Sequence, residues 1–218
     1  MDKVRLRYSK TGRAKYISHL DLSATMRRAM LRAGVALKYS EGFNPHPYIS
    51  VALPLSVGVE SKCELMDFRI DNPTRTDGLP ALINASLPDG LRIDEAYASG
   101  RKFNDIEWIE LTGKLYFDTM YHSDMIKELQ QKFAAHEIVI PKKTKRGVSE
   151  IDIAPHIKNL EVYEGEAIII RSKVSAQEPS IGPEDILNAI KSWDIGAQPD
   201  HTAFMRMELY DRDMKVFR

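Results

Sequence analysis

Short stretches of alternating apolar and polar residues predict strands in the first half of the chain, and one longer stretch predicts a helix. Residues 4–8 alternate with the period of a half-buried strand. Apolar residues then recur at helical spacing from Leu22 to Ala33, after Ser18 and before Gly34, which predicts a helix over residues 20–33. The same reasoning predicts strands over 49–53, 64–70 and 91–96 and a short helix over 79–85.

The second half repeats this order with one strand more. A helix is predicted over residues 123–135, with Ser123 as its N-cap and with Ile126, Leu129 and Phe133 facing inward. Pro183 begins a second helix that continues to about residue 193. Strands are predicted over 108–117, 138–141, 148–153, 167–171 and 204–210, of which the second and third form a projecting hairpin.

These elements predict an α+β protein built from two tandem ferredoxin-like (βαββαβ) halves with antiparallel sheets, the second carrying an extra β-hairpin. With 218 residues the chain suits two domains of about 100 residues each. The small, polar stretch over residues 99–104 is the expected boundary. The predicted domains are therefore residues 1–99 and residues 105–218, the second with a basic hairpin.

Composition narrows the class of protein. Cys63 stands alone, which excludes an internal disulfide and any zinc or iron–sulfur site made from several cysteines of this chain, and no metal site is predicted. No apolar run approaches the roughly 20 residues needed to cross a bilayer, and the N-terminus lacks an apolar signal core. A cytoplasmic protein without membrane contact is expected.

Charge is unevenly distributed although the formal net charge is zero. Residues 1–60 hold ten basic and four acidic side chains, an excess of six positive charges. Phosphate-binding and dinucleotide-binding glycine motifs and the zinc-protease helix motif are missing from the sequence. We therefore expect an anionic partner for the first half and no autonomous redox or ATP-driven chemistry.

The most unusual segment covers residues 40–48, where prolines at positions 45 and 47 stiffen a loop. Phe43 or Tyr48 could stack on a base or another flat ligand while Asn44 and His46 hydrogen-bond its edge. The alternative is a well-packed loop with a purely structural role.

Two more groups of polar residues suit anion recognition. Lys15 and His19 flank the start of the first helix, where the macrodipole favours an anion, although a structural histidine is the simpler explanation for His19. Arg28 and Arg32 lie one turn apart on that helix and suit phosphate or carboxylate recognition, or merely form a solvated face. In the second half, four cations crowd the hairpin tip and suit RNA or an acidic protein surface: Lys142, Lys143, Lys145 and Arg146.

Residues 16–21, 27–34, 39–47 and 54–61 together resemble the radical-SAM-associated domain of unknown function 2344, with looser similarity at 143–147 and 152–153. In that family the domain occurs alone or joined to the C-terminal side of a radical-SAM protein, and its genes are often neighbours of ribonuclease and ribosomal-protein genes. This chain lacks the Cys-x3-Cys-x2-Cys run of a radical-SAM core. The resemblance implies a standalone accessory part without a cofactor of its own, the iron–sulfur cluster and SAM belonging to a partner.

Tandem ferredoxin-like halves also resemble the RNA-binding and RNA-cleaving proteins of CRISPR systems, but their glycine-rich C-terminal loop has no counterpart in residues 176–183. Three functions follow as hypotheses. The first is a non-catalytic module that binds RNA or presents a substrate, such as tRNA or rRNA, to a radical-SAM enzyme. The second is a metal-independent ribonuclease using His19 and His46 as acid and base. The third is a protein-interaction module that docks a radical-SAM partner.

Overall fold

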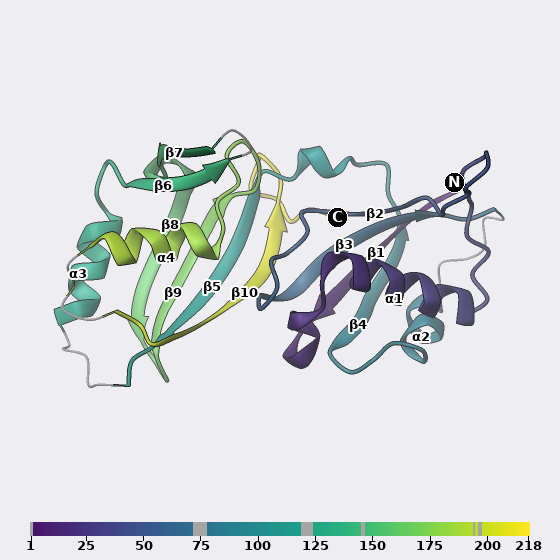
Figure 1. Cartoon of the computed structure of the whole chain (residues 1–218), viewed down its shortest axis with the longest axis horizontal. Helices are drawn as coiled ribbons and strands as arrows, with labels where there is room; N and C mark the ends of the chain where they lie inside the picture. Colours follow the sequence, from purple (N-terminus) through teal and green to yellow (C-terminus); the bar gives the residue numbers. More distant parts are fainter. Residues whose placement is uncertain (1, 72–77, 119–123, 145–146, 194, 196–197) are drawn as a thin grey trace. The chain divides into compact units, whose positions relative to one another are not determined.

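The protein has a mixed α+β fold, shown by a computed structural model that describes residues 2–71, 78–118, 124–144, 147–193, 195 and 198–218 (Figure 1). The chain divides into two compact units, the first comprising residues 1–103 with Arg218 and the second residues 104–217. No helix in the described ranges is long and apolar enough to cross a membrane.

The first unit follows the predicted order of elements. Its strands are β1 (Lys3–Lys10), β2 (Ile49–Val51), β3 (Glu60–Arg69) and β4 (Leu91–Ala98), and its helices are α1 (His19–Arg32) and α2 (Leu79–Asn84). The strands pair antiparallel in the order β4-β1-β3-β2.

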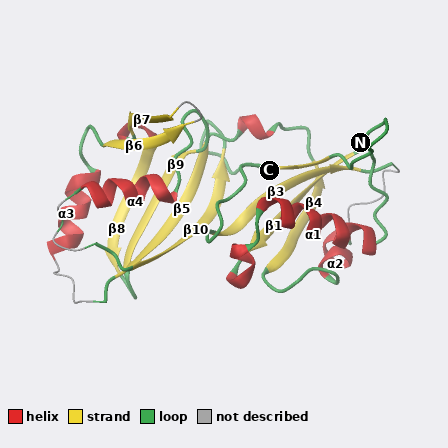
Figure 2. Cartoon of the chain, viewed as in Figure 1, coloured by secondary structure: helices red, strands yellow, loops and turns green. Residues whose placement is uncertain are grey.

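Both helices of the first unit cover one face of its sheet (Figure 2). The alternation in β1 places Val4, Leu6 and Tyr8 in the core beneath α1, whose Leu22 and Met26 are buried in the same cluster. The intervening side chains of β1, including Lys3 and Arg5, therefore lie on the opposite face of the sheet.

Local signals determine where α1 begins and ends. The Ser18 hydroxyl accepts the backbone N–H of Asp21 at 3.2 Å, as an N-cap should, and donates to the Asp21 carboxylate at 2.7 Å. Gly34 follows the helix with φ +74°, a conformation that favours glycine. The predicted helix is thus confirmed, with each end one residue earlier than expected.

The second unit contains the strands β5 (Trp108–Tyr116), β8 (Ile157–Glu164), β9 (Ile168–Ser175) and β10 (His201–Tyr210), paired antiparallel in the order β10-β5-β9-β8. Helices α3 (Asp124–Phe133) and α4 (Pro183–Ser192) cover one face of this sheet (Figure 1). Strands β6 (Val139–Thr144) and β7 (Gly147–Asp152) form a separate two-stranded sheet, which confirms the predicted hairpin.

The structure corrects the sequence analysis at two places in this unit. Strand β8 was not predicted, although it is the neighbour of β9. On α3, Met125 is buried with Leu129 and Phe133, whereas Ile126 is only half-buried. The predicted N-cap Ser123 lies outside the described residues.

Candidate functional site

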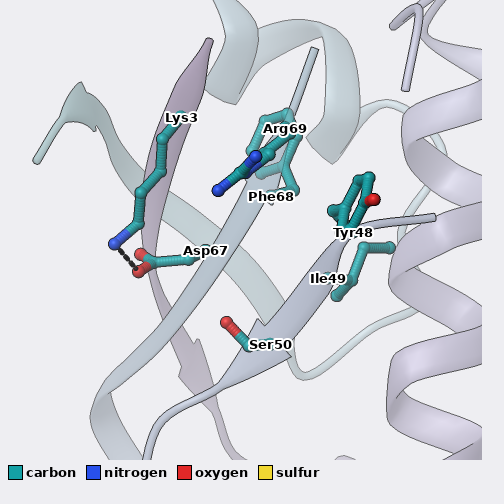
Figure 3. A pocket seen from close by; sticks show the side chains of 7 residues that line it. All are labelled: Lys3, Tyr48, Ile49, Ser50, Asp67, Phe68 and Arg69. Carbon is teal, nitrogen blue, oxygen red and sulfur yellow. Dashed lines mark ion pairs between the residues drawn. The ribbon is translucent and has the colours of Figure 1, made fainter. Parts of the chain in front are cut away.

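A hollow of about 310 Å³ opens in the first unit where β2 meets the end of β3. Figure 3 shows the side chains that surround it, which come from β1, β2, β3 and the residue just before β2. We call it the Tyr48 pocket, and its lining residues are Lys3, Tyr48, Ile49, Ser50, Asp67, Phe68 and Arg69.

An ion-pair network forms one wall of the Tyr48 pocket. Asp67 is only 5% exposed, and its Oδ1 accepts a hydrogen bond from Arg5 Nε at 2.7 Å. The Nζ of Lys3 lies 2.7 Å from Asp67 Oδ2, so two cations share one carboxylate (Figure 3). The buried Arg5 guanidinium also lies 4.6 Å from the centre of the Phe103 ring. The Asp67 charge is thereby more than neutralised.

Aromatic and cationic groups form the other wall. The Arg69 guanidinium lies 5.2 Å from the centre of the exposed Tyr48 ring, and Arg69 is directly opposite Lys3 in the β1–β3 register. Lys38 and Arg69 both approach the carboxylate of Asp2, at 3.8 and 3.9 Å. Four cations therefore surround two carboxylates at this place, which suits an anionic ligand with a flat ring.

The loop that leads into the pocket is closed by local hydrogen bonds. The backbone N–H of Ser40 donates to the His46 carbonyl at 2.9 Å, and the His46 N–H donates to the Ser40 hydroxyl oxygen at 3.1 Å. The Nδ1 of His46 lies 3.1 Å from the same hydroxyl oxygen and 3.3 Å from the Asn44 carbonyl. Tyr39 and Pro47 form an isolated antiparallel bridge just outside these contacts.

Phe43 lies between the residues that these hydrogen bonds join, and its side chain extends into solvent. The Phe43 side chain is fully exposed, at 111% of its reference surface, which is unusual for a phenylalanine. Residues 40–48 contain both the exposed Phe43 and Tyr48, which lines the pocket, so we treat the loop and the pocket together as the candidate surface. Phe43, Asn44, His46 and Tyr48 were predicted for this role from the sequence, whereas Lys3, Lys38, Asp67 and Arg69 were not.

The remaining candidates of the first half are spread over other elements. His19 is the exposed first residue of α1, and the structure records no contact between its ring and that of His46. Arg28 and Arg32 are exposed on α1, with no ion pair or hydrogen bond from their side chains within the described part of the chain. The Lys15 ammonium lies 5.4 Å from the centre of the Tyr16 ring.

Of the four cations predicted for the basic hairpin, the described side chain is that of Lys142, and it is paired. The Nζ of Lys142 lies 2.6 Å from the Asp185 carboxylate of α4 and donates to the Ser180 carbonyl at 2.8 Å. Lys142 therefore anchors the hairpin to the rest of the second unit. The side chain of Lys143, and Lys145 and Arg146 altogether, lie outside the described residues.

A second polar cluster, which the sequence analysis missed, lies on the sheet of the second unit. The buried Glu110 carboxylate accepts hydrogen bonds from Arg171 Nε at 2.8 Å and from the Tyr210 hydroxyl at 2.6 Å. Burial alone raises the pKa of Glu110, but the hydrogen bonds from Tyr210 and Arg171 outweigh it and leave the pKa below its usual value. Burial and the bond to Glu110 raise the pKa of Tyr210 to about 12.

Tyr210 should therefore give the protein a measurable alkaline pH dependence. Because its folded-state pKa of about 12 exceeds the unfolded value, its contribution to stability is complete below about pH 10 and is lost as pH rises to about 12. We expect Tyr210→Phe to cost about 1.5–3 kcal/mol in urea unfolding at pH 8 and progressively less above pH 10. Tyr163→Phe, on an exposed ring of β8, is the matched control. A cost that stays constant across this range would contradict the assignment.

Within the described residues, no group of three or more histidine, cysteine, aspartate or glutamate side chains could hold a metal ion.

A family model described as "Uncharacterized protein conserved in bacteria (DUF2344)" matches residues 3–183. The protein belongs to this family. The DUF2344 match includes all of the Tyr48 pocket and the loop before it. No curated protein matches the chain.

Two solved structures are similar over most of the chain. One is a chain of the "Crystal Structure of a Cbf5-Nop10-Gar1 Complex", with a TM-score of 0.49, 11% identity, and coverage of 94% of this chain and 48% of that one. This protein thus spans about half the length of that chain. The other is an unknown protein from Galdieria sulphuraria, with a TM-score of 0.27, 9% identity, and coverage of 88% and 90%.

Proposed function

We propose that this DUF2344 protein is a non-catalytic RNA-binding module that presents RNA or a ribosomal component to a radical-SAM partner enzyme. The observation that carries the RNA-binding proposal is the surface formed by the Tyr48 pocket and the exposed Phe43. The accessible Tyr48 ring lies there beside Arg69 and shares the pocket lining with Lys3. Lys38 approaches the same Asp2 carboxylate as Arg69, and the exposed Phe43 ring stands five residues before Tyr48. Single-stranded nucleic acids are bound by this combination, because bases stack on rings while cations contact phosphates.

The order of elements supports a finer description of the scaffold. Omitting the β6–β7 hairpin, each unit reads strand, helix, two strands, helix, strand, with the last and first strands side by side in its sheet. We propose that both units are ferredoxin-like and that the hairpin is an insertion between α3 and β8. The radical-SAM partner, and the cluster and SAM it would carry, rest on the sequence resemblance alone.

The proposal predicts that Phe43 and Tyr48 dominate RNA affinity. Stacking is worth about 1–3 kcal/mol per base, so Phe43→Ala/Tyr48→Ala should weaken binding of a single-stranded tRNA or rRNA fragment by roughly tenfold or more. Fluorescence anisotropy at low salt measures this affinity. Leu82→Ala removes an exposed apolar side chain of α2 and should leave the affinity unchanged.

The salt dependence of RNA affinity gives an independent test of the same surface. Arg69→Ala should flatten the slope of log affinity against log salt by about 0.7, the value of one phosphate contact to a single strand. Arg92→Ala is the matched control, because Arg92 is exposed on β4, where it pairs with Asp94. RNA binding no stronger than that of a neutral polymer, or Phe43 and Tyr48 variants that bind RNA normally, would remove the basis of the proposal.

A further inference from the structure

Two aromatic rings lie next to each other on the sheet of the second unit. Trp108 of β5 and Tyr210 of β10 are direct partners in the antiparallel register. Their neighbours Ile109 and Leu209 are buried, at 5% and 1% exposure. Because side chains alternate between the two faces of a strand, Trp108 and Tyr210 belong to the face opposite these buried residues. Both rings are partly exposed.

A lysine ammonium lies over each of the two rings. The Nζ of Lys158 lies 3.8 Å from the centre of the Trp108 ring, and the Nζ of Lys173 lies 4.0 Å from the centre of the Tyr210 ring. The two lysines are directly opposite each other in the β8–β9 register, and like charges in that position destabilise a sheet. Neither lysine pairs with a carboxylate among the residues whose side chains are described. An anion between them would remove this repulsion.

Hydrogen bonds to Glu110 fix neighbouring side chains of this surface. Glu110 fixes the Tyr210 hydroxyl and the Arg171 guanidinium, although the Arg171 side chain is 53% exposed. A hollow of about 270 Å³ extends beside this cluster and includes Lys173, Asn159 and Glu161 in its lining. Glu110 and Glu161 carry two negative charges against the three positive charges of Arg171, Lys158 and Lys173, so these five groups keep one positive charge in excess.

We propose that this surface, the Trp108 platform formed by Trp108, Lys158, Lys173 and Tyr210, binds two consecutive nucleotides of single-stranded RNA. The ammonium groups move from the rings to the phosphates, and two bases take their places on the rings. The exchange is favourable because base stacking on an aromatic ring is stronger than an exposed cation–π contact. This inference rests on the proposed RNA-binding function and adds a second contact surface to it.

Trp108 itself reports on the platform. The chain contains two tryptophans, and Trp193 packs edge-on against Phe133, away from these residues in sequence. In full-length protein carrying Trp193→Phe, all tryptophan emission comes from Trp108. Titration with a single-stranded RNA fragment should quench this emission by roughly half or more, with the same midpoint as the anisotropy of the labelled RNA.

Lysine variants test the phosphate contacts. Lys158→Ala/Lys173→Ala should weaken RNA binding by roughly tenfold and flatten the salt slope by about 1.4, since each phosphate contact to a single strand contributes about 0.7. Lys127→Ala/Lys132→Ala on α3 makes the same change of charge away from the platform and is expected to change neither quantity by as much. Circular dichroism establishes that each variant is folded.

The outcomes separate this inference from the proposed function. If RNA binds but Trp108 emission does not change, the Trp108 platform is wrong and the proposed function stands. If no RNA binds, both are wrong. Polyglutamate that quenches Trp108 with the affinity of RNA would instead assign the surface to an acidic polypeptide and overturn the RNA assignment.

Discussion

Replacing Asp67 with alanine is expected to destabilise the protein by about 3–5 kcal/mol, the cost of removing one partner from a buried ion pair. Arg5 is completely buried, and its Nε and Nη2 donate to the two oxygens of Asp67 at 2.7 and 3.0 Å. The substitution removes the Asp67 carboxylate, whereas the Arg5 guanidinium remains buried and loses its counter-charge. The loss of stability should exceed that caused by most surface substitutions, because an unpaired charge costs far more free energy in the protein interior than in water.

Urea unfolding measures this effect, and two further variants identify its cause. Lys3→Ala removes only the half-exposed partner of Asp67 and should cost less than about 1 kcal/mol. Arg5→Met/Asp67→Leu replaces the buried pair with apolar side chains and should recover most of the stability that Asp67→Ala loses. An Asp67→Ala cost as small as that of Lys3→Ala would show that the buried pair is not important.

The second large effect is expected at Gly90, just before β4. Gly90 has φ +87°, and an added Cβ would lie 2.3 Å from the Thr11 carbonyl oxygen and 2.9 Å from the Ala14 Cβ. The Thr11 N–H also donates to the Gly90 carbonyl at 2.8 Å, so the two segments cannot separate without losing that bond. We expect Gly90→Ala to cost about 3 kcal/mol or more, because it adds a steric clash to backbone strain.

Gly58 provides a matched control for this substitution. Its φ is +91°, but apart from Gly58 and its two chain neighbours no described residue has an atom within 4 Å of the position that a Cβ would take. Gly58→Ala should therefore cost only the backbone strain, about 1–2 kcal/mol. The difference between the two variants in thermal or urea unfolding isolates the close approach of Thr11 to Gly90. Equal losses would show that this approach is readily relaxed.

Elements with a regular period or a strong terminal signal were predictable. The alternation of residues 4–8 identified β1, and the spacing of Leu22 and Met26 together with the Ser18 cap identified α1. Pro183 marked the start of α4, where its missing N–H costs nothing. These signals depend on residues close together in the chain, so they need no knowledge of tertiary contacts.

Strand β8 was missed because its pattern is irregular. Asn159 has φ +49°, and the pairing with β9 shifts register between Lys158 and Glu161. Val162 is the one residue of this strand that is fully buried, so its apolar period is too weak to recognise. Without β8, the strands of the β6–β7 hairpin seemed to be the only ones available before β9.

The candidate surface was predictable only in part. The prolines of residues 40–48 pointed to a stiff loop with exposed rings, and the structure shows Phe43 and Tyr48 exposed. The cations that accompany Tyr48 come from β1 and β3, where Lys3 and Arg69 face each other across the sheet. In the second unit, Lys142 looked like a free cation until its pairing with Asp185 was known.

Periodicity and terminal signals along the chain were therefore sufficient for most helices and strands, for the stiff loop and for the hairpin, because each of these depends on neighbouring residues. Partners far apart in the chain come from the register of the strands and from helix packing. The pairing of Arg5 with Asp67, of Glu110 with Arg171 and Tyr210, and of two lysines with two aromatic rings became visible only in three dimensions. Alternation shows which face of a strand a side chain occupies, but only the folded sheet decides which side chain lies across from it.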